Sequence, residues 1–213
     1  MRAAGRGHIV LIEERRDLAA AVAGVVTGAE RRGLRRKDVH LLVFLVAYGL
    51  GKVGDWGFEA SEEGPRSNLV DKVIDELYDV GVLTLRFERS LGGEPLYVLG
   101  EVEKLPWLES SSEFQVGFEA SRSLVEAARL SSEELEGLVF LLAPEFFLEE
   151  ARRRLEGRRV ELAARLVYRG AMKIDTAASL AGVDKSILEE RVKELRKRDE
   201  LSWLEAGEGG GGS

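Results

Sequence analysis

Cysteine and histidine, which enzymes often use as nucleophiles, bases and metal ligands, are scarce in this chain of 213 residues. It contains no cysteine, and its two histidines are His8 and His40. A zinc site built from one chain is therefore not expected. Adjacent carboxylates occur at residues 62–63 and 149–150, but sequence neighbours do not converge on one substrate atom. We expect neither an enzyme nor a metal or cofactor site, and we interpret His40 as a structural residue.

Residues 185–197 hold polar side chains whose types and spacing fit a different chemistry, the recognition of nucleic acid. Lysine and arginine bind phosphate, serine can hydrogen-bond to base edges, and a glutamate can accept a hydrogen bond from cytosine. Two arginines shortly before this stretch could add to the same face. The candidate DNA-binding residues are Lys185, Ser186, Glu189, Lys193, Arg196, Lys197, Arg158 and Arg159.

Two short helices and a tight turn must position these side chains. The first helix is expected at Thr176–Ala181, and Gly182 allows a left-handed backbone at its end. Small residues on its inner face would let a second helix cross closely. These residues are Ala177, Ala178 and Ala181.

The second helix is expected from about Asp184 to Arg198, with Asp184 or Ser186 as its N-cap. A strand is expected to begin at Leu201–Leu204. The apolar residues predicted to form the buried face of the helix are Ile187, Leu188, Val192 and Leu195. The charged residues lie on the opposite face, so they are predicted to meet solvent or a ligand.

This order of helix, turn, helix and strand resembles the helix-turn-helix of winged-helix DNA-binding proteins. The resemblance implies that the start of the second helix enters the major groove of double-stranded DNA, as in a transcriptional regulator, and that the protein is a dimer. Residues 185–198 carry six basic and three acidic side chains, or +3. The alternative is a non-enzymatic scaffold that uses winged-helix units for protein contacts in a chromosomal, transcription or antitoxin complex.

Charge is divided sharply in the segment before the helix-turn-helix. Residues 110–147 hold seven acids and two bases, whereas residues 148–173 hold eight bases and four acids. The basic segment could join the helix-turn-helix in one positive face. It could instead pair with the acidic helices inside the molecule.

The N-terminal half is expected to repeat the order of helix and hairpin. Helices are predicted at Ile9–Arg32, Asp38–Tyr48 and Ser67–Val80, and strands at Val82–Glu88 and Leu96–Leu99. The predicted outer face of the Ser67–Val80 helix is mostly acidic and would repel phosphate. It comprises Asn68, Asp71, Lys72, Asp75, Glu76 and Asp79. We therefore predict that this half binds a protein partner or a second copy of the chain.

A short run within this half is similar to a known pattern. Gly64-Pro65-Arg66-Ser67, then Leu69, Glu76-Leu77 and Gly81-Val82-Leu83, resembles the run "GP-x-S … L … L … G-[LVI]-[LI]" of the Panacea antitoxin group of archaea and phages. The similarity covers about 25 residues. It implies a helical protein that works mainly through protein partners.

The predicted fold is mainly α with small β-hairpins (α+β), in two winged-helix-like domains. Residues 1–104 would form the interaction domain, residues 105–117 a linker, residues 118–206 a helical domain with the helix-turn-helix, and residues 207–213 a flexible Gly-rich tail. Residues 49–54, GLGKVG, match the dinucleotide pattern G-x-G-x-x-G. No strand is expected before them and no helix directly after them, so we interpret them as a turn.

Composition limits the remaining possibilities. A net charge of −7 argues against non-specific coating of nucleic acid. Charged residues make up 32% of the chain, with one Asn and one Gln, and this composition is typical of a thermophile. The apolar run Leu41–Leu50 is too short to cross a membrane, and the N-terminus lacks a signal-peptide pattern. We expect a soluble, cytoplasmic protein.

Overall fold

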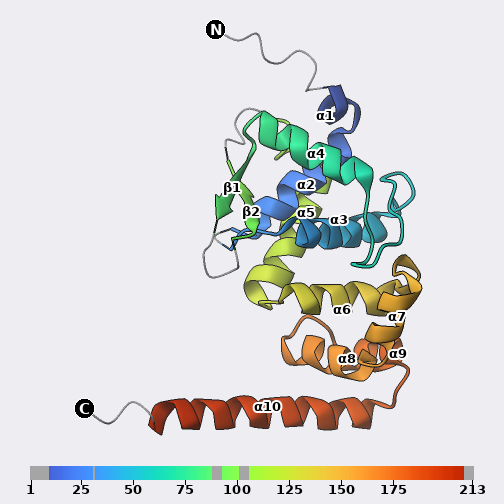
Figure 1. Cartoon of the computed structure of the whole chain (residues 1–213), viewed down its shortest axis with the longest axis vertical. Coiled ribbons are helices and arrows are strands. Elements are labelled where there is room, and N and C mark those ends of the chain that lie inside the picture. The colour runs from blue at the N-terminus through green and yellow to red at the C-terminus, as the bar shows by residue number, and fades with distance from the viewer. Residues whose placement is uncertain (1–9, 31, 88–92, 101–105, 209–213) are drawn as a thin grey trace.

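The computed structural model describes residues 10–30, 32–87, 93–100 and 106–208, with side chains between Ile12 and Asp199 inside those ranges. The fold is mainly helical with a two-stranded antiparallel sheet, which confirms the predicted class (Figure 1). The elements are α1 (Val10–Glu14), α2 (Arg16–Gly28), α3 (Arg36–Leu50), α4 (Asn68–Asp79), β1 (Leu83–Phe87), β2 (Pro95–Leu99), α5 (Ser112–Ser121), the π-helix η3 (Arg122–Ala127), α6 (Ser132–Leu142), the 3₁₀-helix η4 (Pro144–Phe146), α7 (Glu149–Glu156), α8 (Arg159–Tyr168), α9 (Ile174–Ala181) and α10 (Lys185–Glu208).

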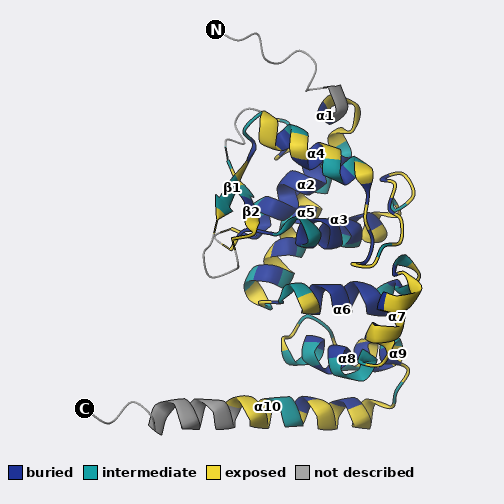
Figure 2. Ribbon diagram, in the orientation of Figure 1, coloured by how far each residue is buried: buried dark blue, intermediate teal, exposed yellow. Residues whose placement is uncertain are grey.

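Helices α2 and α5 cross with their backbones almost in contact, because glycines meet at the crossing. A Cβ atom on Gly24 of α2 would lie 2.2 Å from the carbonyl oxygen of Phe114. One on Gly117 of α5 would lie 2.7 Å from the carbonyl oxygen of Ala21. Helix α2 is buried along most of its length (Figure 2). The small residues of α2 thus allow the two helices to pack closely.

The start of α5 corrects the predicted linker. Residues 112–117 are helical, and the Ser111 hydroxyl caps the helix by accepting a hydrogen bond from the backbone N–H of Glu113 at 3.2 Å. Phe114 and Gly117 are buried. A polar serine run indicated a linker, but here it precedes and caps a helix whose small and aromatic residues complete the core.

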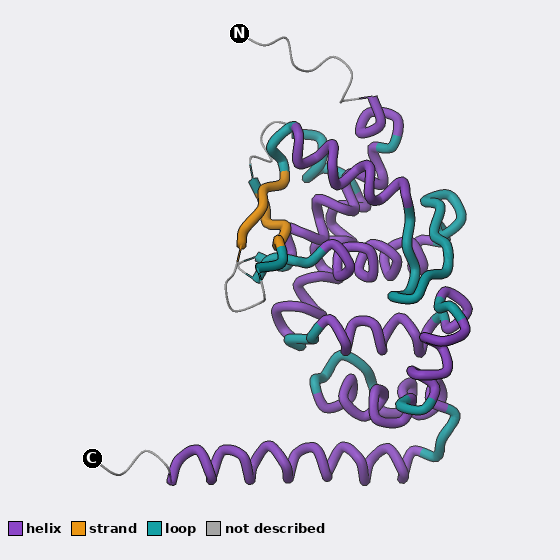
Figure 3. Tube along the Cα trace, viewed as in Figure 1, coloured by secondary structure: helices purple, strands orange, loops and turns teal. Residues whose placement is uncertain are grey.

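Helix α4 and the hairpin after it lie where the sequence predicts them (Figure 3). The Ser67 hydroxyl accepts hydrogen bonds from the backbone N–H groups of Leu69 and Val70, as expected of an N-cap. Gly81 follows the helix with a φ of +82°. Strands β1 and β2 then pair from Leu83 opposite Leu99 to Phe87 opposite Pro95. The turn predicted at residues 90–94 lies mostly outside the described residues.

One apolar core runs through the described residues from Ile12 to Val192. Helices α3, α6, α8 and α10 lie in successive layers, from the middle of the molecule to the end opposite α1 (Figure 1). The rings of Phe44 in α3 and Phe146 in η4 are 4.8 Å apart, and the Lys37 ammonium lies 2.5 Å from the Glu136 carboxylate. The two predicted domains therefore share apolar and ionic contacts.

Helix α10 continues through the residues predicted to form a strand. That prediction, at Leu201–Leu204, is wrong, because a single helix spans Lys185–Glu208. No glycine or proline occurs from residue 185 to residue 206, and strong helix formers dominate. No wing therefore follows the second helix within residues 185–208. The predicted tail of residues 207–213 begins inside this helix, and residues 209–213 lie outside the described part.

The predicted N-terminal helix, Ile9–Arg32, is interrupted at Arg15 and forms α1 and α2.

In the described part of the chain, we find no helix with the length and apolar character needed to cross a membrane.

Candidate nucleic-acid interface

The two predicted helices and the turn between them are present as α9, Gly182-Val183 and α10. Gly182 ends α9 in the left-handed conformation, with φ 69° and ψ 33°. The Val183 N–H donates to the Ala178 carbonyl at 3.1 Å, which closes the turn. The three alanines at positions 177, 178 and 181 are buried, so α10 can cross α9 closely. The sequence therefore predicts both helices and the turn, but not the length of the second helix.

Helix α10 is held on the rest of the molecule by a narrow apolar stripe. Leu188 and Val192 are buried, and Leu195 is half-buried against the core. The Tyr168 hydroxyl of α8 also donates a hydrogen bond to the Asp199 carboxylate of α10. The rest of the described surface of α10 is mostly exposed (Figure 2).

Lys185, the first residue of α10, contacts the first helix of the motif. Its ammonium lies 2.9 Å from the Asp175 carboxylate of α9, and this hydrogen bond is the main reason why its pKa is raised. Both side chains are at least half exposed. Because exposed ion pairs contribute little stability, Lys185 can exchange Asp175 for another anion at small cost.

The arginines of α7 and α8 are engaged within the molecule, and those that bind α6 form the pairing with an acidic helix that the second interpretation of the charge division predicted. Arg154 lies 2.8 Å from Glu136 of α6, and Arg169, just after α8, lies 3.3 Å from Glu134 of α6. Both of these carboxylates are buried. The other pairs are Arg152 and Arg153 with Glu149, Arg158 with Glu133, Arg159 with Glu156, and Arg165 with Glu161.

The candidate residues Arg158 and Arg159 therefore have structural partners. Arg158 joins α8 to the start of α6, and its hydrogen bond is the main cause of the lowered pKa of Glu133. Arg159 also donates to the carbonyl of Leu180 at 3.1 Å, which connects α8 to α9. Arg159 therefore connects α8 to α9, whereas Arg158 connects α8 to α6.

The other candidates share α10, and several of its cations are available. Among the described side chains, no carboxylate lies within ion-pair distance of Lys193, Arg196 or Lys197, and all three are exposed. Ser186 and Glu189 are exposed nearer the start of the helix. Since successive residues turn by about 100°, Ser186, Lys193 and Lys197 lie on the face opposite the buried stripe.

Ile187 departs from the prediction. It was assigned to the buried face of α10, but its side chain is 48% exposed. Leu188, Val192 and Leu195 follow the spacing i, i+4, i+7, whereas Ile187 is one residue out of this pattern and lies about 100° away. Strict use of that spacing in the sequence would have identified it as an exposed apolar residue.

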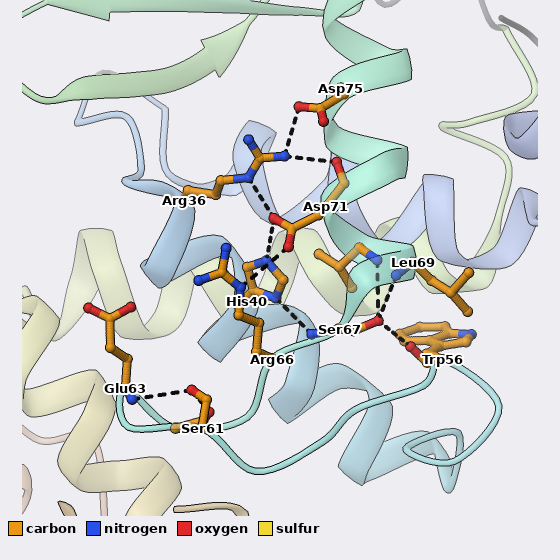
Figure 4. Close-up of polar contacts among 12 residues, drawn as sticks. Arg36, His40, Trp56, Ser61, Glu63, Arg66, Ser67, Leu69, Asp71 and Asp75 are labelled. Atoms are coloured by element: carbon orange, nitrogen blue, oxygen red, sulfur yellow. Dashed lines mark hydrogen bonds and ion pairs between the residues drawn. The ribbon is translucent and has the colours of Figure 1, made fainter.

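A second polar cluster, which no sequence pattern predicts, lies in the N-terminal half (Figure 4). The Asp71 carboxylate of α4 accepts hydrogen bonds from His40 Nε2 at 3.0 Å, Arg36 Nε at 2.6 Å and Arg66 Nε at 3.3 Å. His40 Nδ1 in turn accepts from the backbone N–H of Ser67 at 3.3 Å. These residues are brought together from α3, α4 and the loop between them.

The pKa shifts agree with a structural role for this cluster. Burial lowers the pKa of His40 despite the nearby Asp71 carboxylate, so the imidazole is neutral. Burial alone would raise the pKa of Asp71, but the His40 hydrogen bond and the charge of Arg36 outweigh it and the pKa is lowered. A cavity of about 100 Å³ borders the cluster. Because both ring nitrogens of His40 are already bonded, the histidine joins α4 to the preceding loop, as expected of a structural residue.

This cluster also corrects the predicted acidic face of α4. Asp71 and Asp75 bind Arg36 of α3, and the Glu76 carboxylate accepts a hydrogen bond from the backbone N–H of Ile12 at 3.0 Å. These acids contact other elements of the chain. The periodicity of α4 predicted which residues are polar but could not show that basic groups would cover them.

The G-x-G-x-x-G match at residues 49–54 is a turn after a helix, as interpreted. Gly51 caps α3 with a φ of 69°. Lys52 binds Asp17 of α2 at 3.0 Å and Glu113 of α5 at 2.9 Å. The pKa of Glu113 is lowered to about 2, and the main cause is the hydrogen bond from Lys52. The lysine thus connects helices within the N-terminal half.

Comparisons with protein-family models, with curated proteins and with solved structures found no match to this chain.

Proposed function

We propose that the chain binds double-stranded DNA through α9 and α10 and acts as a transcriptional regulator. The proposal rests on the position of the cations that form no ion pair with a described carboxylate. The arginines of α7 and α8 are paired, whereas Lys193, Arg196 and Lys197 on α10 are exposed without a carboxylate partner among the described side chains. These cations lie on the second helix of a helix-turn-helix, where phosphate contacts would position it on a duplex.

The acidic residues of the same helix favour selective binding. Glu189 and Glu190 are exposed in the first half of α10, and the whole chain carries a net charge of −7. Both features weaken sequence-independent attraction to phosphate. A glutamate at a base edge can still accept a hydrogen bond from the amino group of cytosine. We therefore expect weak binding to arbitrary DNA and tighter binding to a particular site.

A second candidate function is that of a protein-interaction module, in a chromosomal, transcription or antitoxin complex. It is favoured by exposed apolar side chains on α4 and the hairpin: Tyr78 is 45%, Phe87 is 66% and Leu99 is 39% exposed. Such residues are typical of surfaces that contact proteins. The two functions are compatible, since a DNA-binding dimer needs a contact between copies. Sedimentation equilibrium of the purified chain would measure self-association.

Fluorescence anisotropy with labelled duplex DNA across a salt series tests the proposal. The wild-type chain should bind with an affinity that falls steeply as salt rises. The double variant Lys193→Gln and Lys197→Gln removes two phosphate contacts, so the slope of log K against log[salt] should become less negative by about two.

The matched control is the double variant Lys72→Gln and Arg122→Gln, which removes the same charge from exposed positions on α4 and η3. It should bind as the wild-type chain does. If the two double variants lose equal amounts of affinity for DNA, binding responds to net charge alone. No binding of the wild-type chain at low salt, either to this duplex or to any duplex of a random pool, would refute the DNA-binding function and leave the interaction module.

A further inference from the structure

The exposed side chain of Ile187 lies at a place where a DNA-binding helix would meet base edges. It is the third residue of α10, next to Ser186 and two positions before Glu189. Among the described side chains of α9 and α10, it is the one large apolar group that is exposed, at 48%. Leu188, its neighbour, is fully buried. The helix thus presents one apolar group beside its polar ones.

An open groove lies beside the exposed side chain of Ile187. The groove has a volume of about 470 Å³ and lies between the end of α9 and the start of α10. Ala178, Gly182 and Val183 line it together with Ile187, and the polar residues Ser179 and Asp184 complete the lining. A Cβ atom on Gly182 would meet nothing within 4 Å, so the glycine leaves the groove open. An isolated exposed isoleucine would need no explanation, but this one borders a groove with several apolar residues, at the turn of the motif.

The chemistry of the major groove indicates what such a group would contact. Thymine presents a C5 methyl group there, and the other three bases present only donors, acceptors and ring carbons. Resting on the DNA-binding function proposed above, we propose that Ile187 contacts the C5 methyl group of thymine and makes the DNA site of this chain depend on thymine. Ser186, the preceding residue, supplies a neighbouring hydrogen-bonding group.

Deoxyuridine provides a direct test, because it pairs as thymine does and lacks only the methyl group. A duplex is first selected from a random pool with the wild-type chain. Its affinity is then measured by fluorescence anisotropy at one salt concentration, with thymine and with deoxyuridine throughout. The wild-type chain should bind the deoxyuridine duplex about four-fold more weakly for each methyl group contacted.

Two variants assign the effect to one side chain. Ile187→Ala should bind the thymine and deoxyuridine duplexes equally. Leu148→Ala, which removes the same number of carbon atoms from a side chain that is 46% exposed at the start of α7, should keep the wild-type ratio. Since both residues are exposed, neither change is expected to prevent folding.

The possible failures are distinguishable. Equal affinity of the wild-type chain for the two duplexes, or an unchanged ratio in Ile187→Ala, would overturn the thymine contact while leaving DNA binding in place. If no duplex is bound or selected, the proposed function and this inference are both refuted.

Discussion

The α7–α8 segment and the described part of α10 are both rich in lysine and arginine, yet they use these residues differently. The arginines of the α7–α8 segment pair with acids of α6, α7 or α8, and two of those acids are buried. In α10, Arg191 pairs with Glu194, but Lys193 and Lys197 have no such partner among the described side chains. The difference shows that a basic run in a sequence indicates a binding surface only where its cations form no ion pairs with acids that the fold brings close.

The largest effect should come from breaking the pairing of α6 with its basic neighbours. Glu136 is buried and binds both Lys37 and Arg154. Glu136→Gln leaves two cations without a carboxylate and should lower the free energy of unfolding by about 2 kcal/mol, measured by urea denaturation. Glu149→Gln breaks only exposed pairs and should cause no measurable change. If the free energy of unfolding falls by similar amounts in both variants, the ion pairs of α6 stabilise the fold no more than exposed ion pairs do.

The next effect concerns affinity for DNA. Lys193→Gln with Lys197→Gln should weaken binding roughly ten-fold or more at moderate salt, because phosphate contacts are lost. Arg152→Gln with Arg158→Gln removes the same charge from residues that are already paired and should change affinity less than about two-fold. Both are measured by anisotropy on one duplex. A larger loss from the arginine variant would place the interface on α7 and α8 instead.

A smaller effect is expected from pH, through Glu133. The Arg158 hydrogen bond lowers the pKa of Glu133 below its usual value of 4.5, so ionised Glu133 stabilises the fold above that pH. This contribution is lost as pH falls below 4.5 through the lowered pKa. In Arg158→Gln the pKa should return toward 4.5. The difference in unfolding free energy between wild type and variant should therefore shrink on acidification, and a difference that stays constant between pH 7 and pH 3 would exclude this pairing as its source.

The smallest effect should come from the ion pair between α9 and α10. Asp175→Asn releases Lys185 and removes one negative charge near the proposed interface. Affinity for DNA should rise by about two-fold, and more at low salt than at high salt. Asp55→Asn, at an exposed position after α3, serves as the control for net charge. A fall in affinity would show that Asp175 is needed to orient Lys185.

Local signals in the sequence were sufficient for most of the helices. The Ser67 and Ser131 hydroxyls cap α4 and α6, and both accept the backbone hydrogen bonds expected of an N-cap. Gly182 was predicted as the turn of the helix-turn-helix and adopts the left-handed conformation. These features depend on residues within three or four positions of one another, so the chain itself displays them.

Longer-range features were not predictable in this way. The Asp71 cluster joins residues more than 30 positions apart, and Glu136 meets Lys37 across 99 positions. The predicted strand at residues 201–204 also failed, because the helix formers before it carry the helix onward. Spacing along a sequence contains no information on which distant acid a base will meet.

By itself, then, the sequence determined the mainly helical class, the two helices on either side of Gly182 and the scarcity of cysteine and histidine, because propensity, capping and composition are local properties. Only the tertiary structure decided which bases are neutralised, that α5 completes the N-terminal core, and that Ile187 is exposed. These outcomes depend on how helices pack against one another, since packing brings distant charges within ion-pair distance and determines which face of each helix remains in solvent.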